Sequence, residues 1–407
     1  MATAAFAHRV LPVHQSHEAP LRVGLIGCGG RGTGAAAQAL STAGPVELVA
    51  MADLFAERLQ GSLRSLRDPE QGVHERVRVD PEHIFTGFDA AEKLIASDVD
   101  VVLLATPPHF RAQHFASAVA AGKHVFLEKP VAVDGHGVRM ALAAAELARQ
   151  KKLSVVCGLQ RHYQNGYRAT MQRIKDGAIG ELTAARCAWN TGFLWHKERK
   201  ADWSDMEWQV RNWLYFTWLS GDHIVEQHVH NIDVINWAKG GHPVKACGMG
   251  GRQVRTDPKF GNIFDHHAVR FEYADGMWMF SECRQIEGCQ NDVSEHLVGT
   301  RGRAHMDSER WTIEGQESWT HQGPNNNPYQ TEHDELFASI REGRALNDGV
   351  MVAESTLTAI MGRMATYSGR EVTWQEALES PLHPSTPASY VFGPLANYPV
   401  AVPGAKA

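Results

Sequence analysis

The chain has 407 residues, a formal net charge of −6 and a hydrophobic content of 43%. This length is too great for one ordinary domain and fits two, and the weakly negative charge without a basic block excludes the usual signature of nucleic-acid or anionic-membrane binding. The six cysteines are scattered without C-x-x-C spacing, which is typical of reduced thiols and not of a disulfide framework or a zinc site.

Residues 1–20 contain histidines and prolines but no hydrophobic stretch long enough for a signal peptide. We interpret them as a poorly ordered tail. No apolar run in the sequence approaches the ~18 residues that a membrane span needs. These two observations predict a soluble, cytoplasmic protein with no membrane partner.

The first predicted strand, 22–26, runs directly into a glycine-rich turn. Gly27, Gly29 and Gly32 fit the pattern G-x-G-x-x-G. In a dinucleotide-binding turn these glycines serve the tight turn, the close approach of the backbone to the pyrophosphate and the packing of helix on strand. The helix that follows offers free N–H groups to the phosphates. We expect the turn to bind the cofactor through Gly27, Gly29, Gly30, Arg31 and Gly32.

An acidic residue after the second predicted strand, 46–52, selects between the two nicotinamide cofactors. Asp53 lies about twenty residues past the last glycine, where an acidic side chain binds the 2′-hydroxyl of the adenine ribose. Its charge repels a 2′-phosphate, so the sequence predicts NAD in preference to NADP. Arg58 is the nearby residue that would favour the opposite choice, and we interpret it as a solvated helix position.

Strands alternate with alanine-rich helices up to about residue 160, which is typical of a doubly wound parallel sheet in an α/β domain. Three further strands of this sheet are expected at 100–105, 124–127 and 153–157. The helices are expected at 33–41, 55–66, 89–96, 111–121 and 135–150. The sequence therefore predicts an NAD-binding Rossmann domain over residues 21–160.

Two short motifs follow the third and fourth strands of this predicted sheet. Thr106, Pro107 and His109 belong to a T-P-P-H bend, and Glu128 and Lys129 begin an E-K-P motif. Ligands of doubly wound sheets bind outside the carboxyl ends of the strands, so we expect both motifs to line the cofactor cleft. A stiff loop without a ligand is the alternative for the bend. Lys129 can donate a hydrogen bond to the reacting oxygen of a substrate beside the nicotinamide.

After residue 160, strands follow one another without full crossover helices, which indicates an α+β domain with an open, mainly antiparallel sheet. We place this substrate-binding and oligomerisation domain at 161–375. Its strands are expected at 182–190, 243–253, 265–273, 277–285, 293–299 and 302–306. Helices are expected at 165–176 and 352–367, the second returning to the first domain. Residues 376–407 are expected to form an extended C-terminal tail.

Six of the eleven tryptophans fall within residues 189–218. Aromatic faces beside polar groups suit a sugar, whose C–H faces stack on rings while its hydroxyls need donors and acceptors. We single out Trp195 for stacking on such a substrate, and Arg161 and Tyr163, with His162 between them, for hydroxyl contacts. The alternative is that several of these tryptophans belong to the core or to a subunit interface.

A predicted helix over 222–237, capped by Asp222, carries an apolar stripe and beside it a polar one. His230 is expected to act as an acid or base near neutral pH, oriented by Glu226 or Asp233. A solvated polar face is the alternative interpretation. The polar stripe consists of His223, Glu226, His230, Asp233 and Trp237.

The same stripe contains three side chains that could bind a metal ion. His223, Glu226 and His230 are spaced i, i+3 and i+7, which can bring three ligands together. The pattern is not H-E-x-x-H and no cysteine joins it, so we predict no metal there and keep zinc or manganese as the alternative. His266 and His267 face opposite sides of a predicted strand, so at most one of them can join this group.

With these motifs in place, the chain resembles the Gfo/Idh/MocA oxidoreductases, the family of glucose–fructose oxidoreductase and inositol dehydrogenase. The resemblance covers about residues 21–375 and depends on the glycine turn, the T-P-P-H and E-K-P motifs and the segment 221–233. It implies a Rossmann domain followed by an α/β domain whose open sheet commonly forms dimers or tetramers. It also implies that Lys129 is the catalytic lysine, next to a Lys–Pro bond that is often cis.

The family's helix pattern, typically D-x-G-x-H-x-x-D, falls on Glu226, His228, His230 and Asp233. Glutamate stands where aspartate is usual, and His228 stands where glycine is usual. With these two departures, the pattern resembles that of a subgroup that acts on glycosides or other sugar derivatives. Some relatives oxidise a sugar 3-hydroxyl transiently, eliminate the aglycone and then reduce the product. From the resemblance we expect His228 and Asp233 to contact the substrate.

Together these features predict an NAD-dependent dehydrogenase that oxidises a secondary ring hydroxyl of a sugar or glycoside, with C3 as the first choice. The hydroxyl proton would pass to His230, supported by Glu226, while Lys129 steadies the alkoxide. A redox-neutral, NAD-dependent glycosidase is the first alternative, and a non-catalytic sensor of nucleotide and sugar is the second. We expect a homodimer or homotetramer formed through the C-terminal sheet, and no nucleic-acid partner.

Overall fold

The computed structural model describes residues 19–316 and 318–405. The predicted N-terminal tail falls almost entirely on residues 1–18, which lie outside the described residues. Among the described residues, no helix combines the length and the apolar character that crossing a bilayer requires.

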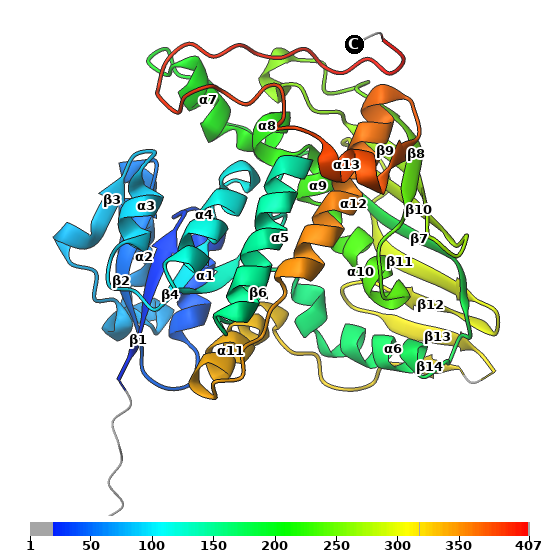
Figure 1. Ribbon diagram of the computed structural model, residues 1–407, viewed down its shortest axis with the longest axis horizontal. Helices are drawn as coiled ribbons and strands as arrows, with labels where there is room; N and C mark the ends of the chain where they lie inside the picture. The colour runs from blue at the N-terminus through cyan, green and yellow to red at the C-terminus, as the bar shows by residue number, and fades with distance from the viewer. Residues whose placement is uncertain (1–18, 317, 406–407) are drawn as a thin grey trace, which may run out of the picture.

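The first part of the chain forms a six-stranded, all-parallel sheet in the order β3-β2-β1-β4-β5-β6 (Figure 1). The strand order reverses between β1 and β4, which places the crevice of a doubly wound sheet at their carboxyl ends. The predicted α/β Rossmann sheet is confirmed. The strands are β1 (Leu21–Ile26), β2 (Val46–Asp53), β3 (Ile84–Thr86), β4 (Val101–Leu104), β5 (His124–Leu127) and β6 (Val155–Cys157).

Both faces of this sheet are covered, so its strands are apolar on both sides. Successive residues of a strand enter opposite cores: Val101 and Leu103 of β4 pack with α1 and α2, whereas Val102 and Leu104 pack with α3, α4 and α5. The helices are α1 (Gly30–Leu40), α2 (Ala56–Leu66), α3 (Ala90–Ile95), α4 (Pro108–Ala120) and α5 (Gly135–Gln150). Helix α11 (Pro328–Arg341), which the sequence analysis missed, joins the α1 side.

The second sheet has nine strands in the order β14-β13-β12-β11-β7-β10-β9-β8-β15. Its adjacent strands are antiparallel except for β7 and β10, so the expected mainly antiparallel sheet is confirmed. The strands are β7 (Leu182–Thr191), β8 (Lys245–Gly251), β9 (His266–Glu272), β10 (Trp278–Gln285), β11 (Asp292–Gly299), β12 (Gly302–Met306), β13 (Trp311–Gly315), β14 (Trp319–Thr320) and β15 (Val372–Thr373).

Helices lie between the two sheets and join the two parts of the molecule (Figure 1). The long helix α12 (Gly349–Ser368) contacts α5 on one side and β8 and β9 on the other, as expected for a helix that returns to the first domain. Two hydrogen bonds secure it to the segment after β5: the Val131 amide donates to Thr356 Oγ1 at 3.2 Å, and Arg363 donates to the Val133 carbonyl at 2.8 Å. The remaining longer helices are α6 (Asn165–Lys175), α7 (Asp205–Arg211) and α10 (Val229–Lys239).

The prediction of a single helix over 222–237 is wrong, because the structure has two helices there, α9 (His223–Glu226) and α10. The amide of His228 bonds to the carbonyl of His223, five residues back, at 3.1 Å. This wider turn interrupts the regular i to i−4 bonding and changes the direction of the side chains after it. The predicted polar stripe therefore does not lie on one face.

The C-terminal segment after α13 (Trp374–Glu379) runs as an extended chain across α7 and α8 (Thr217–Ser220), as Figure 1 shows. Its backbone is held there, since the Met206 amide donates to the Gly393 carbonyl at 3.1 Å and Gln209 donates to the Ala396 carbonyl at 3.3 Å. The segment thus covers the junction of the two domains.

Two interior histidines make the stability of this fold depend on pH. Burial lowers the pKa of His114 from 6.5 to about 4 and that of His228 from 6.5 to about 3. Below about pH 6.5 the unfolded chain takes up protons that the folded chain does not, so stability is complete above that pH and is lost as the pH falls. We expect the free energy of unfolding to fall by about 1.4 kcal/mol per pH unit for each group near pH 5.

Denaturant unfolding at a series of pH values measures this slope. His114→Gln should lower the slope of unfolding free energy against pH by the contribution of one titrating group. His136→Gln, at an exposed position of α5, is the matched control. An equal slope in both variants would contradict the assignment.

Candidate active site

A cavity of about 860 Å³ opens at the carboxyl ends of β1, β2 and β4, at the switch point of the parallel sheet. Pockets at this position of doubly wound sheets bind dinucleotides. Eight of the residues predicted to bind the cofactor line it: Gly27, Gly29, Gly30, Arg31, Gly32, Asp53, Thr106 and Pro107.

The glycine turn has the shape that a pyrophosphate requires. A Cβ at Gly32 would lie 1.8 Å from the Gly27 carbonyl oxygen, so only glycine allows α1 to approach the turn this closely. Gly27 has φ +94°, a conformation that favours glycine. A Cβ at Gly29 or Gly30 would meet nothing within 4 Å, which leaves room for phosphate oxygens beside the N-terminus of α1. The residues present therefore fit NAD.

The carboxylate of Asp53 is fixed at the edge of this cavity. Its Oδ2 accepts a hydrogen bond from the Cys28 amide at 2.7 Å, and its Oδ1 accepts one from the Phe55 amide at 2.8 Å. Each oxygen retains a lone pair for a ribose hydroxyl. Arg58 also lines the cavity, half-buried with its guanidinium 5.4 Å from the centre of the Phe55 ring, and is not the solvated helix position that the sequence suggested.

The second domain contributes to the wall of the cavity. Trp195 and Lys197 line it together with Trp213, so the predicted stacking residue Trp195 shares this cavity with the glycine turn. Burial lowers the pKa of Lys197. Rings of the C-terminal segment pack on cavity-lining rings, with Phe392 centred 6.0 Å from Phe55 and 5.3 Å from Phe88.

His109 is turned away from this cavity. Its Nε2 lies 2.6 Å from the Tyr390 hydroxyl, and its ring packs edge-on against Trp218 at 5.0 Å. Burial lowers the pKa of His109 to about 4. This residue of the T-P-P-H bend therefore connects the first domain to the C-terminal segment, while Thr106 and Pro107 line the cavity.

Arg31 links the glycine turn to the E-K-P motif and to α11. Its guanidinium bonds to Glu128 Oε1 and, at 2.7 Å, to Glu332 Oε1. Glu332 is fully buried, and its burial raises the pKa of this carboxyl well above its ordinary value. Glu332 and α11 were not predicted from the sequence, although Asn327 followed by Pro328 is a recognisable helix start.

Lys129 and Glu226 meet where the two domains face each other. Lys129 follows β5, next to the strand that leads into Thr106, and its bond to Pro130 is cis. Its Nζ donates to the Glu226 carbonyl oxygen at 2.6 Å and to Glu226 Oε1 at 3.1 Å. Their side chains are 11% and 7% exposed, so the pair is almost entirely removed from water.

His230 lies in the first turn of α10, four residues after Glu226. Its ring stacks on Trp189 of β7, with the ring centres 5.7 Å apart. Burial lowers its pKa well below 6.5, and the positive charge of Lys129 lowers it further. Two buried polar atoms at this place make no hydrogen bond to any described residue: Oε2 of Glu226 and Nδ1 of His230. Buried polar atoms without partners are typical of a site where a polar ligand supplies the missing hydrogen bonds.

Other residues expected to contact a substrate are engaged inside the protein. Nε2 of His228 lies 2.8 Å from Ser281 Oγ of β10, and the residue is fully buried because the wide turn after α9 directs it to the sheet. The hydroxyl of Tyr163 donates to Asp348 Oδ2 at 2.6 Å. Neither side chain lines the cavity at the glycine turn.

Two more of these residues form charged pairs near His230. Asp233 accepts from Ser355 Oγ at 2.8 Å and lies 2.7 Å from Nε2 of His162. Arg161 lies 2.9 Å from the buried Glu295. Both pairs have little access to water, and we interpret them as supports of the loop after β6.

A family model described as an oxidoreductase family with an NAD-binding Rossmann fold matches residues 21–159. The model of the C-terminal domain of the same family matches residues 167–305. The two matches together span more than half of the chain. The chain belongs to the Gfo/Idh/MocA oxidoreductase family. Its first domain is the NAD-binding domain of that family, so the predictions of the family and of NAD as cofactor are confirmed.

Relatives in this family differ in activity. The chain is 29% identical over 291 residues to an inositol 2-dehydrogenase of Ralstonia nicotianae, a match covering 70% of this chain and 74% of the relative. It is 27% identical over 248 residues to a 2,7-anhydro-N-acetylneuraminate hydratase of Escherichia coli, covering 59% of each.

Solved structures share the fold. The scyllo-inositol dehydrogenase of Lactobacillus casei with bound NAD(H) and scyllo-inositol superimposes with a TM-score of 0.65 at 18% identity, covering 88% of this chain and 100% of that one. The aldose–aldose oxidoreductase of Caulobacter crescentus gives 0.67 at 17% identity, covering 87% and 100%.

Substitution in the glycine turn should separate cofactor binding from general stability. In Gly32→Ala, the added methyl group would collide with the Gly27 carbonyl and displace α1 from the turn, so we expect NAD affinity to fall by at least about tenfold. Gly34→Ala is the matched control on the same helix, where a Cβ meets only Arg31 at 3.9 Å. Calorimetric titration with NAD measures both variants, and equal affinities would contradict this role of Gly32.

Proposed function

We propose that this protein is an NAD-dependent oxidoreductase that oxidises a secondary ring hydroxyl of a sugar or glycoside, with C3 as the first choice. The observation that carries the proposal is the buried group formed by Lys129, Glu226 and His230. Among the described residues, one carboxylate oxygen and one imidazole nitrogen of this group have no hydrogen-bond partner. A substrate hydroxyl is both a donor and an acceptor, so it can complete such a group.

Lys129 is suited to steady the charge that develops on the reacting oxygen. An ammonium group has three N–H donors, and two of them bond to Glu226. The third remains for the substrate. Because water is largely excluded from the pair, the positive charge acts more strongly on a developing alkoxide than it would in water.

His230 is suited to accept the hydroxyl proton. Burial and the charge of Lys129 lower its pKa, so the ring stays neutral at neutral pH and its basic nitrogen is free. Glu226 supports the imidazolium that forms. NAD, when bound, accepts the hydride at nicotinamide C4.

The polar character of this group and the named activities of the relatives support a sugar or a related cyclic polyol as the substrate. An inositol 2-dehydrogenase acts on a cyclic polyol, and it is similar to this chain over most of its length. The stack of Trp189 on His230 adds an aromatic ring beside the group. We propose that the pairs of Asp233 with His162 and of Arg161 with Glu295, which support the loop after β6, also help to position this group.

A redox-neutral cycle is the second candidate, and the activity of one relative favours it. An enzyme that first oxidises and then reduces the same molecule needs no exchange of cofactor. A hydratase, the named activity of one relative, adds water without net oxidation.

The open face of the second sheet supports a homodimer or homotetramer. Trp278 is 41% and Phe280 is 47% exposed on β10, and Met249 of β8 is 78% exposed. Exposed apolar side chains gathered on one sheet face are typical of a protein interface. We propose that a second copy of the chain covers this face.

Lys129→Met tests the assignment of the catalytic lysine. We expect kcat to fall by at least about 100-fold, because the donor to the reacting oxygen is lost, whereas NAD affinity stays within about threefold. Lys93→Met, at an exposed position of α3, is the control. Because the change leaves Glu226 as an unpaired buried carboxylate, the melting temperature is measured alongside. Full activity in a folded Lys129→Met variant would contradict the proposal.

The two candidate cycles differ in net NADH. A panel of sugars and glycosides is incubated with the protein and NAD, and both NADH and released sugar are measured. Net oxidation predicts about one NADH per turnover. Sugar release without NADH, together with NAD found by mass spectrometry in the purified protein, would replace the first candidate with the second.

A further inference from the structure

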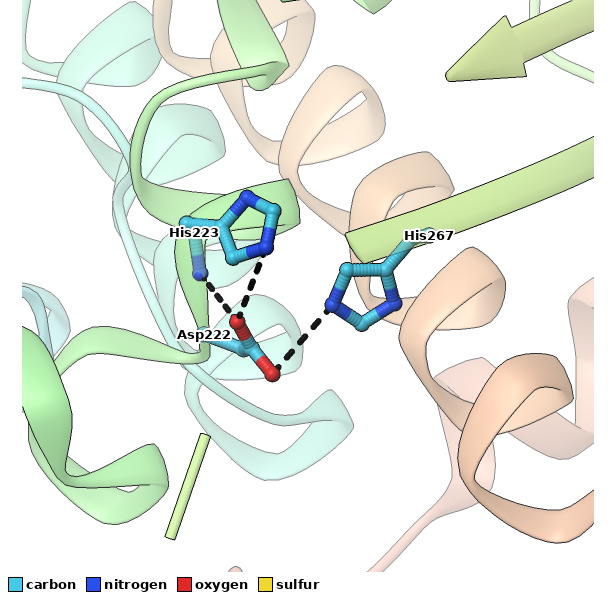
Figure 2. A group of neighbouring side chains, drawn as sticks. All are labelled: Asp222, His223 and His267. Carbon is cyan, nitrogen blue, oxygen red and sulfur yellow. Dashed lines mark hydrogen bonds and ion pairs between the residues drawn. The ribbon is translucent and has the colours of Figure 1, made fainter. Parts of the chain in front are cut away.

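A second polar group lies at the start of α9. Asp222 precedes the helix, His223 is its first residue, and His267 comes from β9 (Figure 2). The three residues are 0%, 3% and 2% exposed. We refer to them as the 222–223–267 group.

The side chains of this group converge. One possible ligand atom from each of the three lies within 4.8 Å of the other two. Nε2 of His223 is 3.9 Å from Asp222 Oδ1, and Nε2 of His267 is 3.3 Å from Asp222 Oδ2. Figure 2 shows both imidazole rings directed at the same carboxylate.

The hydrogen bonds around His267 favour one position for the proton of the neutral ring. Thr366 Oγ1 donates to the Arg363 carbonyl at 2.9 Å. With its hydrogen directed there, the hydroxyl accepts in its 2.9 Å contact with Nδ1 of His267. The proton of the neutral ring is thus on Nδ1, and Nε2 presents a lone pair to the carboxylate. Two such groups repel each other unless a positive charge lies between them.

His223 adds a second unsatisfied ring. Both of its nitrogens are buried and make no hydrogen bond to any described residue. Its ring centre lies 4.9 Å from that of His267. A buried imidazole without a partner for either nitrogen is uncommon, and coordination of a cation would give Nε2 a partner.

The carboxylate is already oriented for such a cation. Its Oδ2 accepts from the Phe264 amide at 2.8 Å and from the Tyr367 hydroxyl at 2.6 Å. Within the described part of the chain, its Oδ1 accepts a hydrogen bond only from the His223 amide, at 2.5 Å, and so retains a lone pair. Outer hydrogen bonds that orient the ligands, here to Asp222 and to Nδ1 of His267, are a regular feature of metal sites.

We propose that Asp222, His223 and His267 bind a divalent transition-metal ion, with Zn²⁺ as the first choice. Two imidazole nitrogens and one carboxylate oxygen are a donor set that zinc prefers. This set differs from His223, Glu226 and His230, the alternative that the sequence offered, because Glu226 faces Lys129. The ion would secure α9 to β9 and thereby set the position of Glu226. The proposal does not depend on the proposed function.

Metal analysis of the untagged, dialysed protein tests the proposal. We expect about one equivalent of Zn²⁺ per chain after reconstitution with Zn²⁺ in excess and desalting, and less than about one-tenth in His223→Gln and in His267→Gln. His266→Gln is the matched control, since His266 neighbours His267 but lies 40% exposed on the other face of β9. The control should retain the metal.

A second, exposed group that could bind an ion must be removed first. Asp80, Glu82 and His83 also bring possible ligands within reach of one another, so all proteins carry His83→Ala. A chelator should lower the melting temperature of this background protein and leave His267→Gln unaffected. The proposal is overturned if the background protein retains no metal after reconstitution with Zn²⁺, Mn²⁺, Co²⁺ or Ni²⁺, which would indicate a protonated His267 beside Asp222. Retention of equal metal in all variants would also overturn it.

Discussion

The buried ion pair between Lys129 and Glu226 is the interaction on which the rest of the site depends, because it joins the two domains. Neither residue lines the cavity at the glycine turn, and Glu128 does not line it either. A pair this far from water is stable only when both charges are present and correctly placed, since removal of either leaves an uncompensated buried charge. Lys129 is placed by the end of β5, and Glu226 is placed by α9. The proposed chemistry therefore requires that the end of β5 and α9 hold Lys129 and Glu226 in matching positions.

Each segment is fixed by its own polar contacts. On the first domain, Arg31 joins the glycine turn to Glu128, next to the lysine, and to Glu332 of α11, so the cofactor turn and the E-K-P motif are mechanically linked. On the second domain, Asp222 has φ +74° and ψ 162°, a conformation that costs ~1–3 kcal/mol outside glycine. Its bonds to Phe264 and Tyr367, and a metal ion if one binds, supply the compensation.

The residues that motifs identify were the easiest to predict. The glycine turn, Asp53 and the Thr106–Pro107 bend line the cavity because each follows a parallel strand, and the ends of neighbouring strands must meet. Side chains placed by helical periodicity were less predictable. The expected stripe on 222–237 assumed 100° per residue, and the wide turn at His228 divides it. His223 then faces His267, Glu226 faces Lys129 and Asp233 faces His162.

By itself, the sequence determined the two kinds of sheet, which follow from local periodicity, and the cofactor, which follows from the glycine turn and Asp53. The family followed from the resemblance of the motifs. The tertiary structure alone decided the partners of each charged side chain: Glu332 with Arg31, Tyr390 with His109, and His267 with Asp222. These partners are more than forty residues apart along the chain. Burial makes such contacts strong, but which groups become neighbours is fixed only when the sheets and helices pack.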